Sequence, residues 1–204
     1  MKKYLPVLLF FAGLVIVGGI LFLTSRSKKQ PVVQEEQPEV AREIPQGEKP
    51  LTSLTPSSDG HWLKLKVDDI KVQGTESLDY EILYKVKDGR TQGVPGTIQL
   101  KSQNSLERDI LLGSESSGKF KFDEGVNQGT LTLRFRNSDG KLVGKLSTDF
   151  HLQSNTNELT SVDGKFKYLL DKIPKGTFFV TMETFSKGYA VFSSSSTPII
   201  GTIE

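Results

Sequence analysis

Side chains that could do chemistry are few in this chain of 204 residues, and they stand far apart. There are two histidines, His61 and His151, and no cysteine, which excludes thiol catalysis, disulfides and cysteine-ligated metals. Both histidines fall where apolar and polar residues alternate, so we expect solvated strand residues rather than ligands or bases. The motifs of zinc proteases, EF-hand loops, serine hydrolases and phosphate-binding loops are absent. We therefore predict no catalytic activity, no cofactor and no metal site.

Two pairs of adjacent acids are the remaining candidates for metal ligands. Asp68-Asp69 and Asp123-Glu124 could each supply oxygen ligands to a calcium ion at the end of a β-sandwich. The alternative is that they are ordinary acids at turns and at a β-bulge. We prefer the alternative, because both pairs adjoin predicted turns or a shift in the strand pattern.

Five residues could form a binding surface. They are Trp62, Lys119, Lys121, Lys165 and Lys167. The four lysines take outward positions in two similar segments, and neighbouring strands would align them into a basic strip for an acidic polymer or lipid headgroup. A solvated face that prevents edge pairing is the alternative. Trp62 is out of phase with Leu63 and Leu65, so it is either an exposed aromatic platform or a cap on the core.

The stretch from Tyr4 to Ser25 is uncharged and predicts a membrane anchor. As a helix, its apolar part would be about 30 Å long, which matches the hydrocarbon thickness of a bilayer. A cleavable signal peptide is the main alternative, but its apolar core would be shorter and a small-residue cleavage site would follow. The best match here, Ser25-Arg26-Ser27, has an arginine at its centre. A core helix is disfavoured because the run is apolar on every face.

The side of the membrane on which the rest of the chain lies is less clear from the flanking charges. Lys2 and Lys3 precede the anchor, and Arg26, Lys28 and Lys29 follow it, so the positive-inside rule is nearly balanced. We expect a single-pass protein of the cell membrane with its C-terminal domain outside the cytoplasm. The net charge of only +2, without a concentrated basic region, argues against nucleic-acid binding.

Three parts are predicted along the chain. Residues 1–26 form the anchor, and residues 27–60 form a disordered linker rich in Pro, Glu and Gln, which cannot bury enough apolar surface to fold. Residues 61–204 form an all-β domain, because short runs of alternating residues recur with turns between them and no convincing helix. This domain is either one enlarged sandwich or a sandwich over 61–153 with a docked unit over 155–204.

The clearest strand runs from Leu78 to Val86, where apolar and charged residues alternate. It predicts that Tyr80, Ile82 and Tyr84 face the core. Asn137-Ser138-Asp139-Gly140 predicts a tight hairpin turn. Phe120 and Phe122 alternate with lysines in the same way, so they are expected on the apolar face of a strand.

An internal echo links two segments of the domain at a spacing of nearly fifty residues. Gly118-Lys119-Phe120-Lys121-Phe122 is repeated as Gly164-Lys165-Phe166-Lys167-Tyr168, and Gly129-Thr130-Leu131 as Gly176-Thr177-Phe178. Duplication of an ancestral unit and chance are both open explanations, since strands and turns generate such echoes by themselves.

These motifs carry a resemblance. A strand opening G-K-F-x-[FY], a loop, a G-T-φ-x-φ strand and a DG-type hairpin resemble the last strands of bacterial immunoglobulin-like or fibronectin type III-like envelope modules. The resemblance covers Gly118 to Phe150 and Gly164 to Ile203. It implies an antiparallel β-sandwich on the cell envelope that spaces, binds or assembles, and it implies no activity. Antibody-type domains are excluded because the chain has no cysteine.

The order of anchor, linker and sandwich leads to two functional hypotheses. The first is a non-catalytic envelope protein that displays its sandwich to bind a protein or an envelope polymer. The second is an accessory or structural subunit of a membrane-envelope assembly, which associates through its anchor or by strand donation. In that case Gly13, Gly18 and Gly19 would form a helix-packing face.

Overall fold

The computed structural model describes residues 41–204. The predicted anchor and the first part of the predicted linker lie outside these residues. Within residues 41–204, no helix has both the length and the apolar character needed to cross a membrane.

The described chain is all-β apart from one short 3-10 helix, which confirms the predicted fold class in its general form. The helix is η1 (Gln46–Glu48). The strands are β1 (Leu51–Pro56), β2 (Trp62–Asp68), β3 (Ser77–Lys85), β4 (Thr91–Gln99), β5 (Leu106–Leu111), β6 (Gly113–Ser116), β7 (Lys119–Phe122), β8 (Gln128–Arg136), β9 (Leu142–Ser154), β10 (Glu158–Thr160), β11 (Lys167–Leu170), β12 (Phe178–Thr184), β13 (Gly188–Ser193) and β14 (Gly201–Ile203).

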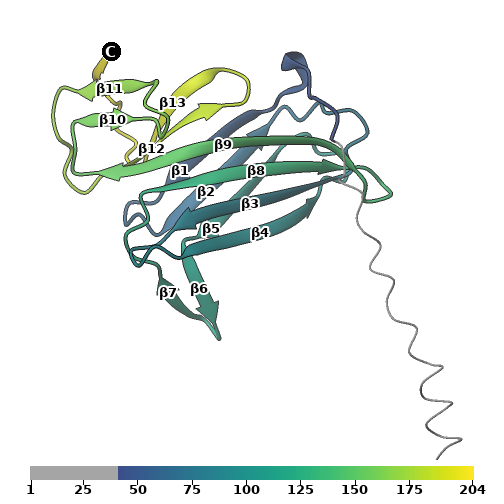
Figure 1. Cartoon of the computed structure of the whole chain (residues 1–204), viewed down its shortest axis with the longest axis horizontal. Helices are drawn as coiled ribbons and strands as arrows, with labels where there is room; N and C mark the ends of the chain where they lie inside the picture. Colours follow the sequence, from purple (N-terminus) through teal and green to yellow (C-terminus); the bar gives the residue numbers. More distant parts are fainter. Residues whose placement is uncertain (1–40) are drawn as a thin grey trace, which may run out of the picture. The chain divides into compact units, whose positions relative to one another are not determined.

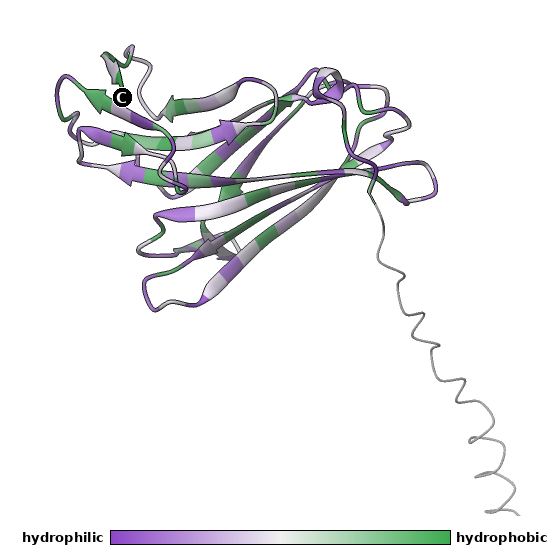
Figure 2. Cartoon of the chain, turned by 45° about the horizontal axis from the view of Figure 1, so that its top comes forward, coloured by the Kyte–Doolittle hydropathy of each residue, from purple (hydrophilic) through white to green (hydrophobic). Residues whose placement is uncertain are grey.

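Two antiparallel sheets enclose the main core (Figure 1). The large sheet has the order β13-β12-β9-β8-β3-β4, and a three-stranded sheet with the order β1-β2-β5 faces it. Leu54 and Leu65 from the three-stranded sheet meet Ile82, Leu131 and Leu133 from the large sheet in one buried cluster. Hydrophobic and hydrophilic residues alternate along the strands, as Figure 2 shows, because successive side chains point to opposite faces.

The predicted strand register is correct where it can be compared. Ile82 and Tyr84 are buried in the main core, Tyr80 packs against that core, and Lys85 is exposed. The predicted hairpin turn joins β8 to β9, where the N–H of Asn137 donates to the carbonyl of Lys141 at 3.0 Å.

The predicted linker is wrong at its C-terminal end. Residues 51–56 form β1, which pairs along its full length with β2, and Leu54 is completely buried. Ile44 also belongs to the main core and touches the backbone at Gly144 so closely that a Cβ there would collide with it. The folded part therefore begins well before His61, because the core recruits apolar residues from a proline-rich segment.

The residues after Asn155 join the first part within one sheet. Strand β12 pairs with β9, so that Val180 lies opposite Leu152 and Met182 lies opposite Phe150. Val180 and Met182 belong to the main core, so this segment shares the sandwich of residues 51–154.

A third layer covers the other face of β12. The outer sheet has the order β10-β11-β14, and its Leu159 and Leu170 pack with Phe179 in a second core cluster. Since Phe179 lies between the inward-facing Phe178 and Val180, β12 is buried on both faces. His151 Nδ1 lies 2.9 Å from the carbonyl oxygen of Thr160 and so links β9 to the outer sheet.

The internal echo corresponds to two successive pairs of hairpins. The first pair is β6–β7 followed by β8–β9, and the second is β10–β11 followed by β12–β13. In each pair the second hairpin belongs to the large sheet and the first lies outside it.

Candidate binding surface

The hairpin formed by β6 and β7 stands apart from the sheets of the sandwich (Figure 1). Within the described residues, these two strands pair only with each other. Gly113 begins the hairpin with φ at +155°, and a Cβ there would collide with the carbonyl oxygen of Lys121. Glycine is therefore required for the close approach of the two strands.

Four aromatic residues gather at the base of this hairpin and form what we call the aromatic cluster. They are His61, Trp62, Phe120 and Phe122. The rings of His61 and Phe122 stack with centroids 4.2 Å apart, and the rings of Trp62 and Phe120 form a T-shaped contact with centroids 5.5 Å apart. Phe120 and Phe122 lie nearly parallel at 6.3 Å. The cluster is continuous, so the hairpin is held to the start of β2 by ring contacts.

The cluster is only partly shielded from water. Phe120 is 48% exposed and Phe122 is 38% exposed, although phenylalanine is among the residues most often buried. A contiguous exposed apolar patch of this kind marks an interaction site more often than a scattered surface residue does.

Lys119 and Lys121 lie on the opposite face of the same hairpin strand, since they alternate with the two phenylalanines. Neither ammonium group forms an ion pair with any residue in the part of the chain that the structure describes. Both lysines are exposed, so they remain available for an external acidic group.

The predicted basic strip does not form. Lys119 and Lys121 lie on the hairpin, whereas Lys165 and Lys167 belong to the turn before β11 and to β11 itself. β7 and β11 are in different sheets, so the echoed strands are not neighbours. Lys165 pairs with Asp163 at 3.3 Å, and Lys167 pairs with Glu158 and Glu204 at 3.3 and 2.9 Å.

Of the five predicted surface residues, the structure thus brings together Trp62, Lys119 and Lys121. His61, Phe120 and Phe122 complete the site, and the sequence did not identify them as surface residues. The alternation of Phe120 and Phe122 with lysines is identical to that of a half-buried sandwich strand. A local signal for a hairpin did exist, because the serine- and glycine-rich segment from Gly113 to Gly118 directly precedes the strand pattern of Lys119 to Phe122.

The acid pairs considered as calcium ligands have other partners. Asp68 pairs with Lys66 at 2.9 Å and Asp69 pairs with Lys71 at 2.7 Å, while Asp123 accepts a hydrogen bond from Tyr84. Within residues 41–204, no group of three or more potential ligands from His, Cys, Asp and Glu converges on one point.

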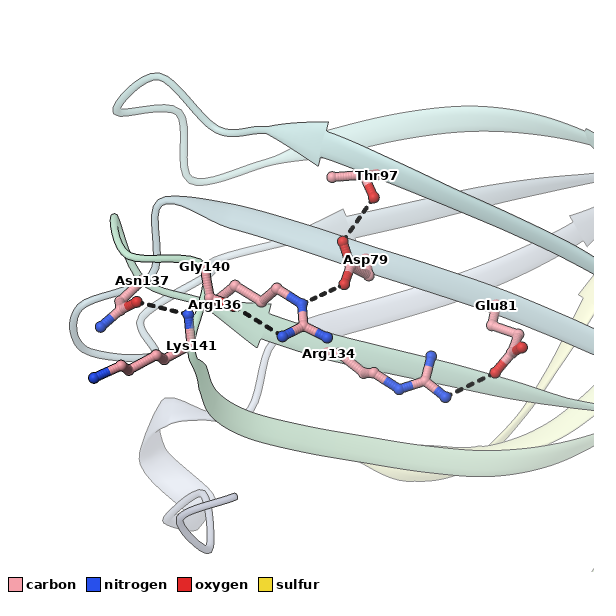
Figure 3. A network of polar contacts seen from close by, with 8 residues as sticks. All are labelled: Asp79, Glu81, Thr97, Arg134, Arg136, Asn137, Gly140 and Lys141. Atoms are coloured by element: carbon pink, nitrogen blue, oxygen red, sulfur yellow. Dashed lines mark hydrogen bonds and ion pairs between the residues drawn. The ribbon is translucent and has the colours of Figure 1, made fainter. Parts of the chain in front are cut away.

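A polar network on the outer face of the large sheet is structural in character (Figure 3). Arg136 Nε donates to Asp79 Oδ2 at 2.6 Å, and Thr97 Oγ1 donates to Asp79 Oδ1 at 2.7 Å. In the same way, Arg134 of β8 donates from Nη2 to Oε2 of Glu81 on β3 at 2.8 Å. These contacts connect β8, β3 and β4 side by side, so the charges are used within the sheet.

No known protein family matches this chain, and no curated protein has detectable sequence similarity to it.

Proposed function

We propose that this protein is a non-catalytic, single-pass membrane protein that displays its β-sandwich outside the cytoplasm and binds a partner protein through the aromatic cluster. The observation that carries the proposal is the exposure of Phe120 and Phe122 beside Trp62 on a projecting hairpin. The uncharged stretch from Tyr4 to Ser25 supports the anchor, and the proline-rich segment after it supports display at a distance from the membrane.

An immunoglobulin-like fold of the fibronectin type III kind is part of this proposal. Strands β1, β2 and β5 would correspond to strands A, B and E, and β3, β8 and β9 to strands C, F and G, with β4 at the C′ position. The pair β12 and β13 would be an extension of this sandwich beyond strand G. The hairpin would then be an insertion between strands E and F, and segments that connect strands often carry binding residues.

Ring geometry favours a protein over an envelope polymer as the partner. A sugar ring stacks on an open aromatic face, but one face of Phe122 is already covered by His61, and Phe120 is engaged in a T-shaped contact with Trp62. The charges also balance locally, because Glu115 lies opposite Phe120 and Asp123 follows β7. A polyanion would require a concentrated basic surface.

The cluster has the composition of a binding hot spot. Aromatic residues dominate the energetics of protein interfaces, and a polar rim surrounds them. Complete burial of a phenylalanine side chain is worth about 1.5–3 kcal/mol, and a substantial part of this is still to be gained at Phe120 and Phe122. The hairpin therefore offers a compact apolar centre for a partner to cover.

A photocrosslinking experiment in intact cells tests the proposal. The photoreactive amino acid p-benzoylphenylalanine replaces Phe120 in the full-length protein. We expect an adduct of defined mass that protease treatment destroys. The matched control is the same substitution at Leu83, an equally apolar exposed residue on the outer face of the large sheet.

Two outcomes contradict the proposal. An adduct that resists protease and disappears with polysaccharide-degrading enzymes would identify a polymer as the partner. Equal crosslinking at positions 120 and 83, or none at position 120, would mean that the aromatic cluster is not a binding surface.

A further inference from the structure

Two sheets end in the C-terminal part of the domain, away from the β6–β7 hairpin (Figure 1). Strand β13 ends the large sheet and β14 ends the outer sheet. A hollow of about 260 Å³ between them is lined by Tyr189 and Val191 from β13 and by Ile203 from β14. We call this opening between the two edges the mouth.

The backbone of β13 is available for pairing along this mouth. Ser194 donates its N–H to the carbonyl of Phe178 at 2.9 Å, so even-numbered residues of β13 bond to β12. Antiparallel ladders alternate, and Tyr189, Val191 and Ser193 therefore direct their N–H and C=O groups away from β12. No other strand of residues 41–204 pairs with this edge.

Two hollows that could hold side chains lie one after the other along β13. The first hollow contacts Tyr189 and Val191, and a second one of about 400 Å³ contacts Ser193 and Ser195. Ile199 borders both hollows, and Phe179 and Ile200 also line the second. An extended segment paired with β13 would place alternate side chains about 7 Å apart along these hollows.

The edge strands β4 and β5 are protected in ways that β13 is not. Strand β4 carries Pro95, which has no N–H to donate, and β5 carries Glu107, Arg108 and Asp109. Strand β13 has the sequence GYAVFS, with neither proline nor charge. An uncharged edge of this kind is a ready template for pairing with another chain.

We propose that the mouth accepts an extended, uncharged segment of another protein, which adds a strand to β13 and places alternate apolar side chains in the two hollows. This mode gives affinity through main-chain hydrogen bonds and specificity through the hollows. A second copy of this chain fits less well, because β11 and β14 line the same hollow and would meet their own equivalents when two β13 edges approach. The inference does not depend on the aromatic cluster, and it favours the accessory-subunit hypothesis.

Selection from a phage library of short random peptides against the full-length protein in mild detergent tests the proposal. We expect selected peptides with alternating apolar residues. A synthetic copy of the best peptide should bind saturably in fluorescence anisotropy. Two versions of this peptide carry N-methyl groups on the odd or on the even residues, and only the version that loses the donors facing β13 should lose binding.

Substitutions at the rim locate the binding. Ile203 and Ile200 are 66% and 69% exposed, so Ile203→Glu and Ile200→Glu should fold normally and raise the Kd of the peptide about tenfold or more. The matched control is Ile173→Glu, since Ile173 is 56% exposed and lines neither hollow. Circular dichroism and melting temperature verify that each variant is folded.

Several results would overturn the proposal. One is a library that yields no peptide with saturable binding. Another is equal binding of the unmethylated peptide and of both N-methylated versions. A third is equal affinity of the peptide for the three protein variants. A protein that is dimeric by light scattering and becomes monomeric on Ile203→Glu would instead assign the mouth to a second copy of this chain.

Discussion

The phenol of Tyr84 donates a hydrogen bond of 2.9 Å to Oδ2 of Asp123, the residue that directly follows strand β7. The ring of Tyr84 is buried in the main core, and burial raises its pKa far above the ordinary value, with the bond to Asp123 adding to the effect. The main-chain N–H of Asp123 also donates to Leu112 at 2.9 Å. The base of the hairpin is thus fixed to the core of the sandwich.

Replacing Tyr84 with phenylalanine tests this link. Tyr84→Phe should lower the free energy of unfolding by about 1.5–3 kcal/mol, the usual worth of a hydrogen bond to a charged group. Urea denaturation measures the loss. Asp123→Asn is the control, because its amide oxygen still accepts from the phenol, and it should cost less. A Tyr84→Phe variant as stable as the wild type would mean that the hairpin base is not held by this bond.

The register of β3 can be tested with a pair of nearby substitutions. Ile82 is completely buried and Lys85 is exposed, so Ile82→Ala should cost about 2–5 kcal/mol and Lys85→Ala less than about 0.5 kcal/mol. Thermal melting of both variants measures the difference. Equal losses would place the strand one residue out of register, since a slip of one residue exchanges the two faces.

Removal of the C-terminal strands should destabilise the sandwich. A chain from residue 41 to 155 lacks β12 and β13, which leaves the edge of β9 open and uncovers Phe150 and Leu152. We expect it to aggregate in size-exclusion chromatography, while residues 41–204 melt in one transition. The start at residue 41 is necessary because β1 lies before residue 57. A shorter chain that folds as well as the longer one would contradict the shared core.

A tyrosine of β13 and an aspartate in the turn between β10 and β11 give a prediction for pH dependence. Tyr189 donates to Asp163 Oδ2 at 2.6 Å, and Ser161 donates to Asp163 Oδ1 at 2.6 Å. The bond from Ser161 and then that from Tyr189 hold the pKa of Asp163 well below its ordinary range, and the bond to Asp163 raises the pKa of Tyr189 to about 12.

The sign of each effect follows from linkage. Because the pKa of Asp163 is lowered in the folded state, its ionised form stabilises the fold above pH ~4, and this stabilisation is lost as the pH falls. Because the pKa of Tyr189 is raised, its protonated form stabilises the fold below pH ~10, and that stabilisation is lost as the pH rises through about 12. Ultraviolet difference titration should show two late phenols, those of Tyr84 and Tyr189, and the one that belongs to Tyr189 should be missing in Tyr189→Phe. Asp163→Asn should shift that phenol toward pH ~10 and flatten the acid side of the melting profile. An unshifted phenol in Asp163→Asn would refute the assignment.

The proposed orientation has a direct test. A reporter that is active only in the cytosol and one that is active only after export are each fused after Glu204 of the full-length protein. We expect activity from the exported reporter alone, because the anchor and linker would place the sandwich outside. An active cytosolic reporter with a silent exported one would reverse the orientation and remove the display function.

Much of the strand structure is determined by the sequence itself. The alternation from Leu78 to Val86 identified β3 and the burial of Ile82 and Tyr84, and the turn at Asn137 to Gly140 identified the β8–β9 hairpin. Both features are local, because side chains alternate along any strand and a tight turn depends on the conformations of a few adjacent residues. The lack of cysteine and of catalytic motifs is also read from the sequence alone.

Tertiary structure decided which strands pair with one another and what covers their apolar faces. Residues 51–56 have little alternation, and they became β1 only because β2 offers an edge and the core needs Leu54. Phe120 and Tyr80 both alternate with charged residues, yet Tyr80 packs against the main core while Phe120 stays half exposed on the hairpin. Strand pairing joins residues far apart in the chain, so a two-residue period shows that one face is apolar but not what will cover it. The separation of Lys121 from Lys167, the aromatic cluster and the open edge of β13 all follow from that non-local choice of neighbours.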